Sequence, residues 1–311
     1  MRAVGDSALG ISEIVLGGNV FGWTADTAAS FDILNAYVGA GGNSIDLADS
    51  YPHWAPGCTG GESEAIVGEW MADRGNRDDL VIATKVGKFP GNYGLTQEQI
   101  TSGLEGSLRR LRTDYVDLYY CHLDDEQTPL EETLETLAGH VEAGRIRAIA
   151  ASNYSSARLQ AALDTSDRLG LPRFVAVQPQ YSLVVRDEFE GPLAELCARE
   201  GLACLPFWPL AAGFLTGKYT SSDVEGAARG RHVEAFFTAR NWRILDLVRA
   251  IAEQYGVAPT TVAVAWLLAR PGVTAPVASV SRTAQLPALM AAKGLTLDPA
   301  DVTRLNEVSA T

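Results

Sequence analysis

Short apolar segments alternate with longer amphipathic ones along the chain, and this alternation predicts strands that are each followed by a helix. Several of the short segments are rich in Val and Ile and apolar on both faces, which is typical of strands in a buried parallel sheet. The eight predicted strands are residues 13–16, 43–48, 80–85, 116–122, 146–152, 174–178, 203–207 and 274–280. An eightfold repeat of strand and helix favours a (β/α)8 barrel over an open sheet.

Recognisable capping sequences precede several of the predicted helices. Thr96 and Gln99 have the spacing of a capping box, and an apolar stripe at helical spacing follows them. Thr128 before Pro129 predicts an N-cap followed by a first-turn proline. Ser155 is expected to cap the next helix. Residues 2–12, with Gly-Asp-Ser as the turn, predict a small hairpin outside the barrel.

The chain has no linker-like, low-complexity or highly charged block, so residues 1–311 are expected to form one domain. The longest apolar run, residues 262–269, is too short to span a membrane and predicts a buried helix. Polar residues interrupt the first eighteen positions, where a secretory signal needs an unbroken apolar stretch. We therefore expect a soluble, cytoplasmic protein.

Composition narrows the classes of partner. A hydrophobic fraction of 47% is ample for a large core, and the formal net charge of −13 argues against binding to nucleic acid or anionic lipid. The four cysteines have no metal-ligand spacing, so we expect reduced thiols and no metal site. Because the overall charge is negative, a phosphate-bearing ligand would have to be held by cationic or hydrogen-bonding groups close to it.

Polar side chains gather at the predicted carboxyl ends of consecutive strands, where a (β/α)8 barrel carries its active site. In chain order they are Asp46 with Tyr51 just beyond it, Lys85, His122, Ser152 with Asn153, and Gln178. Any one of them alone could be a structural residue, such as half of a buried ion pair. Five consecutive strands that end in this way favour a reaction site.

Four of these residues suit proton donation to a carbonyl oxygen. A phenol such as that of Tyr51 is a weak acid, and the charge of Lys85 favours the phenolate and lowers the phenol pKa. Asp46 can hold Lys85 in place and keep it protonated. His122 can donate a hydrogen bond that orients the carbonyl and stabilises negative charge. No residue in the set can deliver a hydride, so a redox cofactor is required.

Six segments in this order resemble the aldo-keto reductase superfamily over nearly the whole chain. They are NSIDLADSY, LVIATKVG, VDLYYCHLDD, IAASNYS, VQPQYS and GFLTGKY. The resemblance implies that Asp46, Tyr51, Lys85 and His122 form a catalytic tetrad, and that Ser152, Asn153 and Gln178 hold a nicotinamide carboxamide. It also implies hydride transfer from NADP(H), or less often NAD(H), to an aldehyde or ketone, with no metal.

The remaining cofactor residues follow from the same resemblance, with departures from the family pattern. Phe207-Trp208-Pro209-Leu210 stands where Tyr-Ser-Pro-Leu is usual, so Phe207 can still stack on the nicotinamide. Gly213, Gly217 and Lys218 resemble the loop that closes over the pyrophosphate. The expected adenosine-phosphate segment contains Ser279, Ser281, Arg282 and Gln285. Arg282 and Ser281 suit a 2′-phosphate, helped by the following helix N-terminus, which favours NADPH over NADH.

Substrate contacts are expected from loops at the barrel mouth. The predicted aromatic contacts are Phe21, Trp23, Trp54 and Tyr93. Residues 219–240 are polar, long and glycine-containing, and they predict a lid with little fixed structure, in which Arg229 and Arg231 could meet an anionic group.

Three other functions stay open at the level of sequence. The chain could be a cofactor-binding regulatory subunit with low turnover. It could run the reverse direction as an alcohol or sugar dehydrogenase with NAD. A metal-dependent hydrolase barrel would use His53, Asp49, His122 and Asp124, although the His-x-His pattern expected after the first strand is missing.

Overall fold

A closed barrel of parallel strands forms the centre of the molecule. The computed structural model describes residues 1–220 and 230–310, and within them eight strands run in the order β11-β10-β9-β8-β5-β4-β3-β12. Their bounds are β3 (Val15–Gly17), β4 (Ser44–Asp46), β5 (Val81–Val86), β8 (Val116–Cys121), β9 (Ile146–Ser152), β10 (Phe174–Gln178), β11 (Ala203–Cys204) and β12 (Val277–Ala278). Bridges from Cys204 to Val273 and from Phe207 to Val277 close the ring. The predicted (β/α)8 barrel is confirmed.

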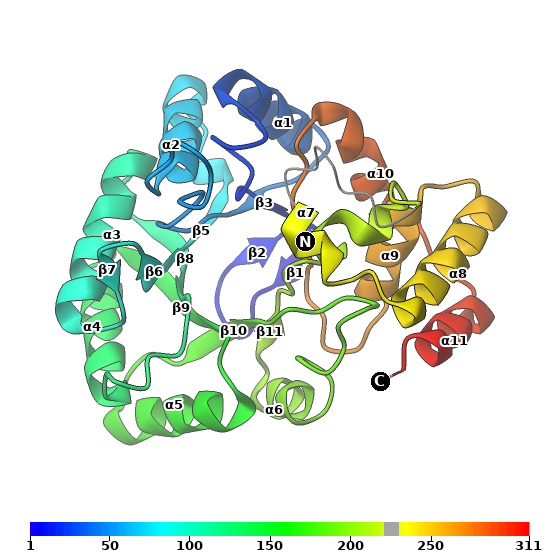
Figure 1. The fold of residues 1–311 in the computed structure, drawn as a ribbon. Helices are drawn as coiled ribbons and strands as arrows, with labels where there is room; N and C mark the ends of the chain where they lie inside the picture. Colours follow the sequence, from blue (N-terminus) through cyan, green and yellow to red (C-terminus); the bar gives the residue numbers. More distant parts are fainter. Residues whose placement is uncertain (221–229, 311) are drawn as a thin grey trace.

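Helices surround the barrel on its outside (Figure 1). The described α-helices are α1 (Thr27–Gly39), α2 (Glu62–Arg74), α3 (Gln97–Leu111), α4 (Leu130–Glu142), α5 (Ser156–Leu169), α6 (Pro192–Glu200), α7 (Gly230–Glu234), α8 (Ala239–Tyr255), α9 (Pro259–Leu268), α10 (Leu286–Met290) and α11 (Pro299–Val308). Short 3₁₀ helices η1 (Arg77–Asp79), η2 (Ala211–Thr216), η3 (Thr283–Gln285) and η4 (Ala291–Gly294) lie between them. No helix within residues 1–220 and 230–310 is long and apolar enough to cross a lipid bilayer.

The N-terminal hairpin is also confirmed and closes one end of the barrel. Strands β1 (Arg2–Ala3) and β2 (Gly10–Ile11) pair antiparallel, and Figure 1 draws them faintly, behind the barrel centre. Val4 and Leu9 of this hairpin pack in the same apolar cluster as Val175 of β10. Gly5 has φ of +56°, and a Cβ there would lie 2.4 Å from the Val175 carbonyl oxygen. The turn therefore needs glycine both for its conformation and for the close approach.

Two of the three helix caps follow the prediction. Thr96 and Gln99 form the capping box of α3, and the hydroxyl of Ser155 accepts from the backbone at the start of α5. The prediction at Thr128 is wrong, because α4 begins after Pro129 as N-cap, with no side-chain cap hydrogen bond. The Thr128 hydroxyl instead donates to Asp125 over 2.7 Å, so a nearby carboxylate competes successfully for it.

The first, second, seventh and eighth strands are displaced or shorter than predicted. Their predicted ranges were 13–16, 43–48, 203–207 and 274–280, whereas β3, β4, β11 and β12 contain two or three residues each. Proline at positions 206 and 276 removes a backbone donor from the ladder, so β11 and β12 stop short and isolated bridges complete the closure.

The predicted lid, residues 219–240, falls partly outside the described residues. Positions 221–229, including Arg229, are not described, and neither is the side chain of Arg231. The described part is more regular than expected, because α7 occupies Gly230–Glu234 and α8 begins at Ala239.

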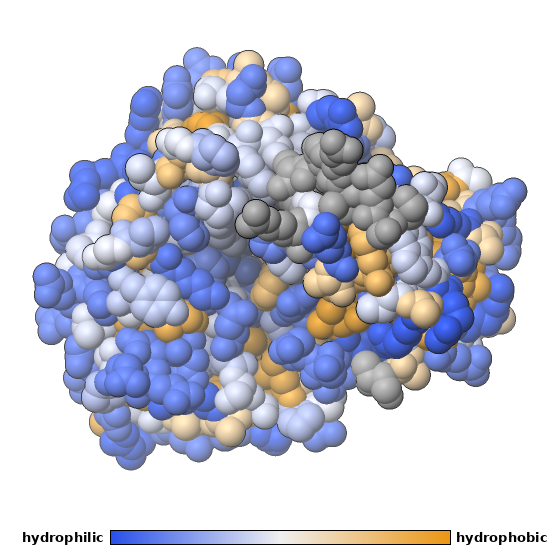
Figure 2. Space-filling model, viewed as in Figure 1, coloured by the Kyte–Doolittle hydropathy of each residue, from blue (hydrophilic) through white to orange (hydrophobic). Residues whose placement is uncertain are grey.

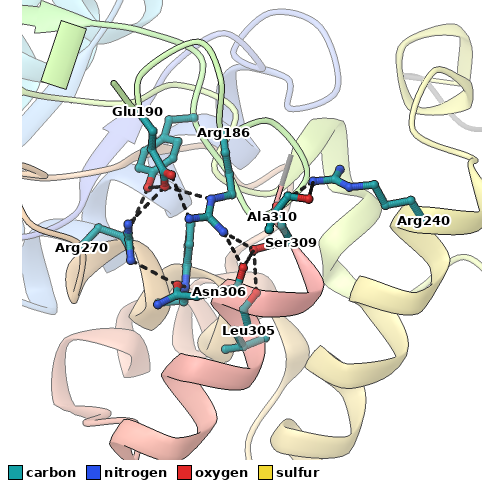
Figure 3. Close-up of polar contacts among 10 residues, drawn as sticks. Arg186, Glu190, Arg240, Arg270, Leu305, Asn306, Ser309 and Ala310 are labelled. Atoms are coloured by element: carbon teal, nitrogen blue, oxygen red, sulfur yellow. Dashed lines mark hydrogen bonds and ion pairs between the residues drawn. The ribbon is translucent and has the colours of Figure 1, made fainter. Parts of the chain in front are cut away.

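A polar network anchors the last helix (Figure 3). Arg186 donates to both carboxylate oxygens of Glu190 over 2.8 and 2.9 Å, and to Asn306 O and Ser309 Oγ over 2.7 and 2.8 Å. Arg270 reaches Glu190 and Asn306 from the other side. These contacts tie α11 to the segment between β10 and α6.

Candidate active site

The carboxyl ends of the strands bring the predicted tetrad together. Asp46 ends β4, Lys85 is the penultimate residue of β5, and His122 directly follows β8. Lys85 Nζ donates to Asp46 Oδ2 over 2.6 Å, to the Leu47 carbonyl over 2.7 Å and to Tyr51 Oη over 3.4 Å. Lys85 is fully buried, so its three donors are directed by these acceptors alone within the described residues.

Burial changes the expected pKa values of Lys85 and Tyr51. Burial alone would lower the pKa of Lys85, but Asp46 and Tyr51 outweigh it and raise the pKa, so the ammonium is retained. The expectation that the pKa of Tyr51 is lowered needs correction. Burial raises the pKa of Tyr51, and the opposing effect of the Lys85 charge does not fully offset it. Tyr51 thus keeps its proton at neutral pH.

His122 is a neutral imidazole beside Tyr51. Burial lowers its pKa well below the usual range, and the charges of Lys85 and Lys88 act in the same direction. Its ring lies edge-on to Tyr51 with 5.8 Å between centroids. Nδ1 has no hydrogen-bond partner within the described residues. A neutral imidazole can still donate one N–H to a ligand oxygen.

Ser152, Asn153 and Gln178 lie together beside the tetrad. Gln178 Nε2 donates to Asp46 Oδ1 over 2.9 Å, and the Ser152 hydroxyl donates to the Gln178 carbonyl over 2.9 Å. Asn153 has φ of +61° and donates to the His122 carbonyl over 2.8 Å. Side-chain hydroxyl and amide groups therefore meet at one wall of the cavity above Tyr51.

This first cavity has a volume of about 260 Å³. Its lining includes Tyr51, His122, Ser152, Asn153, Gln178 and Phe207 on one side, and Trp23, His53, Trp54, Lys88 and His232 farther out. Trp54 lies edge-on to both Tyr51 and Trp23, with centroids 5.5 and 5.9 Å apart. Figure 2 shows the mostly hydrophilic face of the molecule, with apolar side chains gathered mainly on the side of α7 and α8.

Two predicted substrate contacts are misplaced. Phe21 is fully buried in the core between strands and helices, so it cannot wall the cavity. Tyr93 lies in the hairpin of β6 (Lys88–Phe89) and β7 (Asn92–Tyr93), is 64% exposed and is absent from the cavity lining. Trp23 and Trp54 do line it.

A second cavity, of about 380 Å³, continues from the first and shares Asn19 and Trp208 with it. Eight of the predicted cofactor residues line it: Pro209, Leu210, Gly213, Lys218, Ser279, Ser281, Arg282 and Gln285. Gly217 directly follows η2 as its C-cap and is not in the lining. Two hydrogen bonds join its sides, from Ser279 to Asn19 over 2.6 Å and between Thr24 and Ser281 over 2.7 Å.

The helical segment expected after β12 is present. η3, α10 and η4 follow one another without a break from Thr283 to Gly294, so a helix N-terminus lies directly after Arg282. The backbone N–H groups of Ser281 and Arg282 are occupied, because both donate to the side-chain oxygen of Gln285. The Arg282 side chain is exposed.

The joined cavities fit a nicotinamide dinucleotide. One end offers the hydroxyl and amide groups of Ser152, Asn153 and Gln178, with the half-buried Phe207 ring beside them. The other end offers the cations Lys218 and Arg282 to phosphates. Trp208, where both cavities meet, has φ of +55° and lies edge-on to Phe207.

The sequence prediction also missed several lining residues, among them Asn19, Lys88 and His232. Asn19 follows β3 by two residues, so the rule that active-site residues follow barrel strands could have found it. Lys88 is placed by the β6–β7 hairpin, which was not predicted. His232 belongs to α7, inside the expected lid, and lies edge-on to Trp208 with 5.7 Å between centroids.

The residues of the hydrolase alternative are not gathered into one site. His53 and His122 line the first cavity, but Asp49 faces a separate cavity beside Arg110, and Asp124 pairs with Arg158 over 2.8 Å. Within residues 1–220 and 230–310, no group of three or more His, Cys, Asp or Glu side chains could hold a metal ion.

Comparison with known proteins agrees with this geometry. The Aldo/keto reductase family model matches residues 13–310, and the chain belongs to this family. A probable voltage-gated potassium channel subunit beta from Oryza sativa subsp. japonica is 32% identical over 92% of this chain and 88% of its own length. Aldo-keto reductase YhdN from Bacillus subtilis is 32% identical over 97% and 89%. L-glyceraldehyde 3-phosphate reductase from Escherichia coli K12 is 31% identical over 92% and 85%. Family membership implies an NAD(P)H-dependent oxidoreductase that acts on carbonyl groups.

Proposed function

We propose that this protein reduces an aldehyde or ketone to the alcohol with NADPH, and that Tyr51 donates the proton. One observation carries the proposal. Tyr51 Oη lies 3.4 Å from Lys85 Nζ, which is itself 2.6 Å from Asp46 Oδ2, and Tyr51 borders the first cavity. A phenol that touches a buried ammonium and opens to a cavity is suited to give a proton and be stabilised as the phenolate.

The four residues divide the work at the carbonyl oxygen. As this oxygen gains negative charge, the Tyr51 hydroxyl donates its proton to it, and Lys85 stabilises the phenolate that remains. Asp46 keeps Lys85 charged and in position. Neutral His122 donates a second hydrogen bond, which orients the oxygen. When bound, NADPH supplies the hydride for the carbonyl carbon.

Other residues hold the cofactor in this proposal. Ser152, Asn153 and Gln178 bind the carboxamide, and Phe207, with Pro209 and Leu210 beyond it, forms the bed for the ring. Gly213, Gly217 and Lys218 serve the pyrophosphate. Ser279, Ser281, Arg282 and Gln285 serve the adenosine phosphate, and the forked Arg282 side chain favours NADPH over NADH.

The proposal is tested by following oxidation of NADPH and NADH with a panel of aldehydes, ketones, quinones and sugars. We expect turnover by the wild type and a loss of at least about 10²-fold in kcat for Tyr51→Phe, with NADPH binding retained in a fluorescence titration. Tyr255→Phe on α8 is the matched control. The reductase proposal would be contradicted if the wild-type protein bound NADPH but none of the carbonyl compounds in the panel caused its oxidation.

A second candidate is a cofactor-binding regulatory subunit with little turnover. Relatives described as potassium channel beta subunits, such as the Oryza sativa protein, favour it. The intact set of Asp46, Tyr51, Lys85 and His122 favours the reductase. The same assay separates the two, because a regulatory subunit would bind NADPH tightly and turn over carbonyl compounds very slowly.

A further inference from the structure

Lys88 is a cation of the first cavity that has no counterion among residues 1–220 and 230–310. It lies three residues after Lys85, at the start of β6, and it is half-buried in the lining. No hydrogen bond or ion pair joins Lys88 to any other described residue. The nearby Lys85 differs, because its charge is matched by Asp46 at 2.6 Å.

The described lining of the cavity contains no carboxylate, although the chain has 38 Asp and Glu against 25 Lys and Arg. Burial and the charge of Lys85 lower the pKa of Lys88, and the charge of Lys88 in turn contributes to the lowered pKa of His122. Because Lys85 is balanced by Asp46, the uncompensated positive charge lies farther out, at Lys88 in the described lining of the cavity, inside a protein with a net charge of −13.

A half-buried ammonium has lost part of its hydration, so it gains most from a ligand that brings the missing negative charge. We propose that the substrate is a carbonyl compound with an anionic group, a carboxylate or a phosphate, and that Lys88 binds this group while the carbonyl lies at Tyr51. This inference rests on the proposed function, since it names the substrate class of the same site.

Trp23 and Trp54 also line the cavity, and their aromatic side chains suit an apolar spacer between the two ends of such a substrate. Lys88 then acts as a specificity residue: it touches the substrate but takes no part in the proton transfer. A neutral carbonyl of the same shape would bind with the ammonium left unpaired, and it would be the poorer substrate for that reason.

The test uses two matched pairs of aldehydes and the full-length protein with NADPH. The pairs are 4-formylbenzoate with its methyl ester, and glyceraldehyde 3-phosphate with glyceraldehyde. We expect kcat/KM to favour the anionic member of at least one pair by about tenfold or more, and Lys88→Met to bring that ratio close to one. Lys88→Arg should preserve the preference. Lys293→Met, at a half-buried lysine outside the first cavity that donates to the Ala40 carbonyl, should leave the ratio unchanged. The pair with the larger ratio identifies the anion.

A binding measurement separates this inference from the reductase proposal. Titration of benzoate and of inorganic phosphate into the protein saturated with NADP⁺ should show at least one of them binding, about tenfold more weakly to Lys88→Met. Neutral aldehydes reduced without any anionic preference, or a preference that survives Lys88→Met, would overturn the inference and leave the reductase standing. If no carbonyl is reduced, the reductase proposal fails, and the titration alone decides whether Lys88 forms an anion site.

Discussion

Gln178 donates a 2.9 Å hydrogen bond to one oxygen of Asp46, while the other oxygen of the same carboxylate accepts from Lys85 at 2.6 Å. β10 and β4 are not neighbours in the sheet, so this bond crosses the barrel mouth. Asp46 therefore has both oxygens satisfied by side chains from different strands, and its position under Lys85 is fixed from two directions.

Gln178→Leu should reduce kcat in carbonyl reduction by about tenfold, because the Asp46 oxygen loses its donor and Lys85 is held less firmly. Steady-state kinetics with saturating NADPH provide the measurement. Gln160→Leu, at a half-buried side chain on α5 outside both cavities, is the control and should have no effect on kcat. An unchanged kcat in Gln178→Leu would contradict the positioning role.

Asp49 should make the protein less stable as the pH rises. It is 1% exposed, neither carboxylate oxygen has a partner within the described residues, and burial together with the charge of Glu64 raises its pKa to about 8. The folded state thus holds a proton that the unfolded state releases near pH 4, so stability falls between about pH 4 and about pH 8, by at most about 1.4 kcal/mol per unit.

Urea unfolding of Asp49→Asn, which cannot ionise, measures this effect. The stability of the variant relative to the wild type should increase by about 2–4 kcal/mol from about pH 5 to about pH 8. Asp73→Asn, at a side chain that is 60% exposed, should show no comparable change. Parallel pH profiles for Asp49→Asn and the wild type would show that Asp49 is ionised in the folded protein.

Arg186→Met should destabilise the fold by about 2 kcal/mol, because a buried charged network loses its central donor. Arg186 is 8% exposed and joins the segment after β10 to the end of α11. Arg199→Met, at a side chain 59% exposed, should cost less than about 1 kcal/mol. Denaturant unfolding compares the two, and equal losses would argue against the anchoring role of Arg186.

Arg282→Ala should weaken NADPH binding by about tenfold or more and NADH binding by much less, because a charge-assisted contact to the 2′-phosphate is lost. Fluorescence titration of both cofactors is the measurement. Lys293→Met controls for the general loss of one positive charge. Equal weakening for the two cofactors would mean that Arg282 does not discriminate between them.

Strand and helix periodicity was sufficient to predict the barrel, because each buried strand and amphipathic helix leaves a local pattern in the sequence. The juxtaposition of Asp46, Lys85 and Gln178 was also predictable, since residues at the ends of parallel strands meet at one rim. The raised pKa of Tyr51 was not predictable from the sequence. A neighbouring charge can be inferred from spacing, but the depth of burial that outweighs it depends on the complete fold.

The wrong prediction at Phe21 and the missed cavity residue Lys88 both lie in short segments outside the barrel strands. Phe21 and Trp23 both follow the first strand, and no periodicity in so short a segment distinguishes the ring that enters the core from the one that borders the cavity. Lys88 enters the cavity because β6 pairs with β7. Pairing of such a short hairpin depends on its surroundings more than on its own sequence.

The hairpin of β1 and β2 covers the amino end of the barrel, so only the carboxyl end is open to ligands. Since side chains such as Leu118 and Tyr120 fill the barrel interior and Val4 and Leu9 cover its amino end, Tyr51 is reached only from the carboxyl rim. The longer cavity joins the shorter one at Trp208, so a dinucleotide lying in it would form part of the wall of the substrate chamber. Under the proposed function, the alcohol would depart while the nucleotide stays, and the nucleotide would have to bind before the carbonyl compound. The position of the longer cavity behind the shorter one would thus set an order of entry and exit.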